Sequence, residues 1–153
     1  HVLPMSPDSL LEFRLVSDSL HYTIFYTRKG KTVKYFYADS LTGKTSVVTE
    51  NFYKSFTAPL AQLRAWSSVK TPSDTVGIDF SKPWINIFVA LGTSAGDTTR
   101  TISLDIFEKG GNSTFAIVRS SNDAQLYIVP KSFFRTFGKS VQSRVFSEAA
   151  PPA

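Results

Sequence analysis

The chain has 153 residues, of which 42% are hydrophobic and 14% aromatic, and this composition is typical of a globular protein with a real core. The formal net charge is +5 and the isoelectric point is about 9.5, which favours anionic partners. The absence of cysteine excludes disulfides, thiolate zinc sites and cysteine nucleophiles, and no apolar run approaches the about 20 residues needed to span a bilayer.

The first half of the chain alternates apolar and polar residues in four short stretches, as half-buried strands do. The predicted strands are Leu11–Val16, His21–Arg28, Thr32–Ala38 and Thr45–Thr49. Between the second and third, Lys29-Gly-Lys31 predicts a basic hairpin tip in which Gly30 is free to adopt a positive φ.

The periodicity then changes to that of a helix. Phe52, Phe56, Leu60 and Leu63 are spaced four, four and three residues apart, which places them on one helical face. We therefore expect a helix from about Asn51 to Ser67 with a break near Pro59, followed by a linker at 71–74.

The second half repeats this order of strands and helix. Strands are predicted at 76–80, 84–91, 101–107, 115–119 and 126–129, with the inward face of the middle strand formed by Ile102, Leu104 and Ile106. A last helix is expected from about Lys131, and its apolar stripe consists of Phe134, Phe137, Val141 and Val145.

These elements predict an α+β fold, a tandem repeat of about four antiparallel strands plus a helix. Each half would leave one sheet face bare by itself, so we expect two sheets packed with two helices. The expected organisation is a single domain made of two halves, about 10–69 and 75–146, with a flexible C-terminal tail at 147–153.

Residues for catalysis are scarce in this chain. Its two histidines are His1, at the terminus, and His21, in a predicted strand, where a lone histidine is usually a surface or packing residue. No phosphate-binding glycine loop, nucleophile elbow or calcium-type carboxylate motif is present. We therefore predict a protein that is not an enzyme, with no catalytic residues, no metal and no cofactor.

Aromatic and cationic side chains are interleaved in the first half, with a sparser set, including Trp84 and Phe88, in the second. Single-stranded nucleic acid is held by this mixture, because bases stack on rings while Lys and Arg neutralise phosphates. The alternative is that the aromatic residues only build the sheet, for example through a cross-strand pair of Tyr26 with Tyr35. The predicted nucleic-acid-binding residues are Arg28, Lys29, Lys31, Lys34, Tyr35, Tyr37, Lys44, Arg100, Lys109 and Arg119.

The order of elements resembles the Whirly fold, which includes plant single-stranded DNA binders and the mitochondrial RNA-binding proteins of kinetoplastids. The segment 102–138, with its Ile128-Val-Pro-Lys-Ser-Phe-Phe-Arg-Thr-Phe-Gly138 step, resembles the related purine-rich-element repeat. Lys29-Gly-Lys-Thr-Val33 matches only the first three residues of the plant Lys-Gly-Lys-Ala-Ala-Leu signature. The resemblance implies single-stranded RNA or DNA binding by a homo- or hetero-tetramer with a related subunit. For the kinetoplastid branch, it implies guide-RNA binding and RNA annealing in mitochondrial RNA editing.

A second resemblance leads to a different function. Gly77-Ile-Asp-Phe-Ser-Lys-Pro83 and Tyr127-Ile-Val-Pro130 are similar to steps found in bacterial envelope domains encoded beside gliding-type ABC transporters. That resemblance implies an interaction module of the bacterial envelope that binds no nucleic acid.

Overall fold

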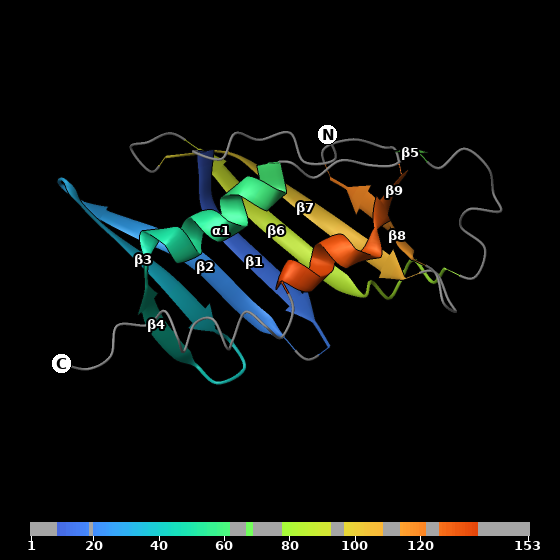
Figure 1. The fold of residues 1–153 in the computed structure, drawn as a ribbon, viewed down its shortest axis with the longest axis horizontal. Helices are drawn as coiled ribbons and strands as arrows, with labels where there is room; N and C mark the ends of the chain where they lie inside the picture. The colour runs from blue at the N-terminus through green and yellow to red at the C-terminus, as the bar shows by residue number, and fades with distance from the viewer. Residues whose placement is uncertain are drawn as a thin grey trace.

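The computed structural model describes residues 9–18, 20–61, 67–68, 78–92, 97–108, 114–121 and 126–137. The described part forms one nine-stranded antiparallel sheet with the strand order β4-β3-β2-β1-β6-β7-β8-β9-β5 (Figure 1). The strands are β1 (Leu10–Ser17), β2 (His21–Lys29), β3 (Thr32–Asp39), β4 (Lys44–Val48), β5 (Ser67–Ser68), β6 (Ile85–Gly92), β7 (Thr98–Glu108), β8 (Phe115–Ser120) and β9 (Leu126–Pro130).

The prediction of two packed sheets with two helices is wrong. The two halves of the chain are joined edge to edge, because β1 pairs with β6 and sets Phe13 opposite Val89 and Leu15 opposite Ile87. The physical reason is that an unpaired edge strand leaves a row of backbone donors and acceptors, and the edge of the other half satisfies them. The apolar alternation of both strands also coincides in this register, so their buried residues share one face.

Both helical elements lie on the same face of the sheet (Figure 1). The α-helix α1 (Glu50–Ala61) buries the predicted stripe residues Phe52, Phe56 and Leu60 against the sheet. The expected extension to Ser67 is wrong, because Ser67 and Ser68 form β5 and pair with Ile128 and Tyr127.

The second helical element is a 3-10 helix, η3 (Lys131–Phe137), where the sequence predicted an amphipathic helix that continues further. Phe134 and Phe137 of the predicted stripe are buried. The prediction of a strand at 76–80 is also wrong, because residues 78–80 are not in a strand. Instead, the Phe80 ring packs on the Phe107 ring, with the two centroids 4.9 Å apart.

An aromatic cluster beneath the helices joins the first described strand to the last described helical element. Phe13 is fully buried, and its ring lies 5.6 Å from that of Phe56 in α1 and 5.3 Å from that of Phe137 in η3. The Tyr22 hydroxyl donates a hydrogen bond to the Phe137 carbonyl at 2.8 Å. The first half therefore shares its core with the last described element of the second half.

Several predicted features lie outside the described residues: Leu63, the linker at 71–74, Val141, Val145 and the tail at 147–153. Within the described ranges, no helix has the length and apolar character needed to cross a membrane.

Candidate nucleic-acid interface

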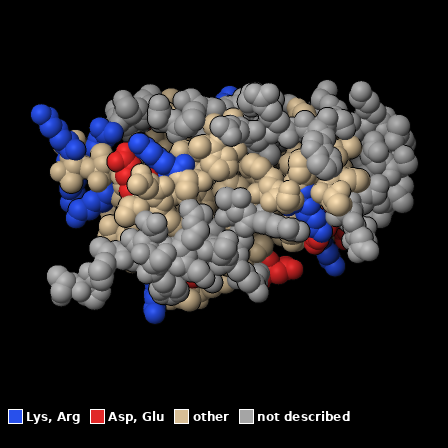
Figure 2. Space-filling view, in the orientation of Figure 1, with Lys and Arg blue, Asp and Glu red and all other residues tan. Residues whose placement is uncertain are grey.

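The predicted basic cluster lies at the tip of the β2–β3 hairpin. Lys29 and Lys31 flank the turn, Lys34 follows in β3, and all three side chains are exposed. Gly30 has φ of 61°, which confirms the predicted left-handed turn residue. Lys and Arg side chains gather at this end of the molecule, at the left of Figure 2.

Strand alternation divides the predicted site between two faces of the sheet. Residues directly opposite each other on antiparallel strands share a face, and successive residues of one strand alternate between faces. Tyr35 and Tyr37 therefore lie on the helix side, and Lys34 and Phe36 lie on the opposite side. Tyr37 is buried, and its ring stacks on Tyr22 with the centroids 5.2 Å apart, so it belongs to the core.

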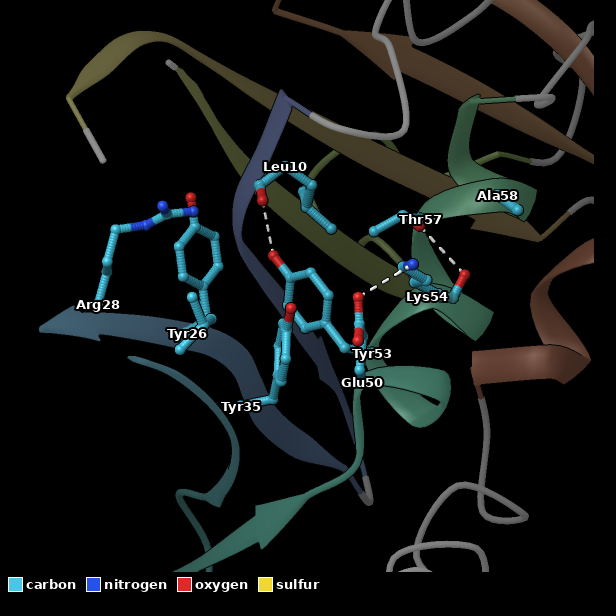
Figure 3. A pocket seen from close by; sticks show the side chains of 10 residues that line it. Leu10, Tyr26, Arg28, Tyr35, Glu50, Tyr53, Lys54, Thr57 and Ala58 are labelled. Atoms are coloured by element: carbon cyan, nitrogen blue, oxygen red, sulfur yellow. Dashed lines mark hydrogen bonds and ion pairs between the residues drawn. The ribbon is translucent and has the colours of Figure 1, made fainter. Parts of the chain in front are cut away.

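On the helix side, Tyr35 contributes to a pocket of about 530 Å³ between the hairpin and α1 (Figure 3). Its ring lies 6.1 Å from that of Tyr26 and 4.9 Å from that of Tyr53. The pocket, called here the tyrosine pocket, is lined by Leu10, Tyr26, Arg28, Val33, Tyr35, Glu50, Tyr53, Lys54, Thr57 and Ala58.

Two tyrosines of this pocket are held in the neutral form. Burial, with smaller contributions from Tyr26 and Tyr35, raises the pKa of Tyr53, whose hydroxyl donates to the Leu10 carbonyl at 2.6 Å. Burial and the nearby Glu50 carboxylate raise the pKa of Tyr35. A phenol is already a hydrogen-bond donor at neutral pH, and the raised pKa extends this donor form of both tyrosines further into alkaline solution.

The opposite face of the sheet carries a second set of rings. Phe25 is paired with Phe36, and their rings stack with centroids 5.2 Å apart and planes inclined by 19°. Phe88 of β6 lies on the same face, opposite Arg14 of β1. The three rings are partly exposed, and no described element covers this face over β1 to β4. We call Arg14, Phe25, Lys34, Phe36 and Phe88 the open platform.

The cations of the open platform differ in how firmly they are positioned. The Arg14 guanidinium lies 5.0 Å from the centre of the Phe88 ring and 3.3 Å from a Glu12 carboxylate oxygen. Lys34 is exposed at the hairpin end of the platform, opposite Thr27. Arg14 is thus fixed over a ring, whereas the lysine is a solvated charge that is able to meet a phosphate.

The remaining predicted residues are dispersed. Lys44 begins β4 and pairs with Asp39, at the opposite end of β3 from the hairpin tip. Arg100 is exposed in β7, opposite Leu91. Arg119 is 3.0 Å from Asp105 and 5.0 Å from the Phe107 ring, so its charge is already engaged within the protein. Lys109 lies outside the described residues.

The sequence prediction missed Arg14, Phe25 and Phe36 as site residues. The signal for Phe25 and Phe36 was present in the alternation of β2 and β3, since both residues lie opposite the tyrosine face, and that for Arg14 was present in the alternation of β1. The sequence prediction chose tyrosines as the stacking residues because they lie next to lysines in the chain. Which face of the sheet stays open, however, depends on the face that the helices cover, and tertiary packing decides that.

No protein-family model matches the chain, and neither a curated protein nor a solved structure matches it significantly. Among the described residues, no group of three or more His, Asp or Glu side chains is placed to hold a metal ion.

Proposed function

We propose that this protein binds single-stranded nucleic acid, RNA in the first instance, on the open platform and the adjoining hairpin tip. The observation that carries the proposal is the single sheet face on which partly exposed Phe25, Phe36 and Phe88 lie beside the cations Arg14 and Lys34.

The chemistry of such a face suits an unpaired strand. Bases stack on aromatic rings, and each engaged ring contributes roughly 1–3 kcal/mol. The exposed Lys29, Lys31 and Lys34 supply charge for the phosphates beside those rings. A duplex hides its base faces, so the platform favours single strands.

The proposal depends on this surface and not on a family. The expectations of a tetramer and of a guide-RNA role came from the resemblance of the element order to the Whirly fold, and the open platform does not carry them. Single-stranded nucleic acid in general is therefore the ligand class that the surface supports.

Titration of a fluorescent single-stranded oligonucleotide of about 12 nucleotides tests this function. Replacing Phe25 and Phe36 together by Leu keeps apolar bulk but removes both stacking faces, so affinity should fall by at least about tenfold. Replacing Lys29, Lys31 and Lys34 together by Ala should weaken binding and flatten the dependence of log affinity on log salt, because up to three phosphate contacts are lost.

Lys82 provides a matched control, because it is an exposed lysine in the loop before β6, away from the hairpin. Lys82→Ala should leave affinity nearly unchanged, and circular dichroism should show that all variants remain folded. Absence of oligonucleotide binding to the wild-type protein at low salt would overturn the proposal.

A protein-interaction role is the second candidate, and the edge of the sheet favours it. β4 is an outermost strand of the described sheet. The side chain of Val47 in this strand is 51% exposed, and that of Leu41 in the preceding turn is 63% exposed. An exposed sheet edge is able to pair with an extended segment of another protein. Under this role, oligonucleotides do not bind at low salt, and substituting Val47 by Lys abolishes capture of a protein partner.

A further inference from the structure

The tyrosine pocket is a second concave site, on the opposite side of the sheet from the open platform. Its volume of about 530 Å³ is within the range of small-molecule sites. Figure 3 shows Tyr26, Tyr35 and Tyr53 side by side across the pocket, with Arg28 at one end and Glu50 and Lys54 at the other.

The charges of the pocket leave one cation uncompensated. The Lys54 ammonium is 3.0 Å from a Glu50 carboxylate oxygen, so this pair is close to neutral as a unit. Arg28 is exposed at the end of β2 and forms no ion pair with any residue in the described ranges. A planar guanidinium with free donors recognises phosphate through two parallel hydrogen bonds.

The aromatic lining suits a flat ring. Tyr26 and Tyr35 are both partly exposed, and the Tyr26 ring meets the buried Tyr53 ring edge-on at 5.9 Å. The hydroxyls of Tyr26 and Tyr35 have no hydrogen-bond partner within the described part of the chain. These hydroxyls are therefore available to hydrogen-bond the polar groups of a ligand whose flat ring lies against the tyrosine rings.

We infer that the tyrosine pocket binds a nucleotide phosphomonoester, with its base against Tyr26 and Tyr35 and its phosphate on Arg28. The nucleotide has two sources, a free mononucleotide or the phosphorylated end of a bound strand, and the second source rests on the proposed function. The hairpin connects the two sites, because Arg28 faces the pocket and the next residue, Lys29, lies on the platform side.

Oligonucleotides of one sequence, with and without a terminal phosphate at either end, test the strand-end source. A terminal phosphate carries a charge of about −1.5 to −2, so we expect the phosphorylated strand to bind about tenfold more tightly. Uridine monophosphate, compared with uridine as the phosphate-free control, tests the free-nucleotide source in the same titration.

Three variants separate the pocket from the platform. Arg28→Ala removes the phosphate contact, and Ala58→Leu fills the pocket from an exposed position of α1 with a strong helix former. Both should abolish the preference for phosphate, and Ala58→Leu, which removes no charge, should leave the affinity for the unphosphorylated strand unchanged. Lys34→Ala, on the platform, should weaken both strands by the same factor.

The outcomes distinguish this inference from the proposed function. Equal binding of phosphorylated and unphosphorylated strands, with no binding of uridine monophosphate, overturns the pocket inference and leaves platform binding intact. Binding of uridine monophosphate that Arg28→Ala abolishes supports the pocket inference even if no oligonucleotide binds. A phosphate preference that persists in both Arg28→Ala and Ala58→Leu places the phosphate elsewhere and overturns the inference.

Discussion

At the scale of single residues, two buried tyrosines connect segments that are far apart in the sequence. Tyr22 donates to the carbonyl of Phe137 at 2.8 Å, and Tyr53 donates to that of Leu10 at 2.6 Å. Each ring adds apolar area to the core, and each hydroxyl donates a hydrogen bond to a backbone carbonyl of a distant segment. Such residues fix the positions of η3 and of the start of β1.

Replacing Tyr53 by Phe tests the second connection. The loss of the hydroxyl leaves the Leu10 carbonyl without this donor, so the free energy of unfolding at pH 7 should fall by about 1–3 kcal/mol in urea titrations. Burial raises the Tyr53 pKa, so in the wild type the stabilisation persists below the unfolded phenol pKa of about 10 and declines as the pH rises above it. The difference between wild type and variant should therefore narrow in alkali.

Tyr26→Phe is the matched control for this measurement, since the Tyr26 hydroxyl has no partner in the described part of the chain. Its stability at pH 7 should stay close to that of the wild type. A difference between Tyr53→Phe and the wild type that is constant from pH 7 to strongly alkaline conditions would contradict the assignment.

At the scale of elements, local sequence signals place the start of α1 well and its end poorly. Thr49 precedes the helix, and its hydroxyl accepts a hydrogen bond from the Phe52 amide at 3.1 Å, as an N-cap does. After Ala61 the helical spacing of apolar residues still favours a longer helix, yet Ser67 and Ser68 pair with β9. Pairing with a strand that comes about sixty residues later is not encoded in any local window.

Thr49→Ala should lower the free energy of unfolding by about 1 kcal/mol, because the Phe52 amide loses its capping acceptor. Thr49→Ser keeps the oxygen and should retain most of the stability. Chemical denaturation of the three proteins measures the difference, and equal losses in both variants would show that the threonine methyl, not the cap, is what matters.

At the scale of the whole molecule, the continuous sheet makes the two halves one cooperative unit. β1 and β6 pair along seven register positions, and the core beneath the helices contains residues from both halves. If one half unfolded alone, the other would be left with an unpaired edge strand, β1 or β6. The chain should therefore unfold as one domain, although its sequence reads as two similar blocks.

A core substitution in the first half tests this cooperativity through a reporter in the second. Phe13→Ala removes a fully buried ring of β1 and should cost about 3–5 kcal/mol. In a Trp66→Phe background, Trp84 fluorescence should report the same shifted midpoint as far-ultraviolet circular dichroism. Leu41→Ala, at an exposed turn position, should shift neither. A Trp84 transition that stays in place while the dichroism midpoint moves would show that the halves unfold separately.

The sequence by itself determined most local elements: the strands β1 to β4 and β6 to β9, the glycine turn at Gly30 and the buried stripe of α1. Each follows from alternation, turn chemistry or helical spacing, which act within a few residues. Tertiary structure decided that the halves form one sheet and that Phe36, rather than its neighbour Tyr35, lies on the open face. Both decisions depend on which edge pairs and which face the helices cover, and those are settled by the packing of segments that are distant in the chain.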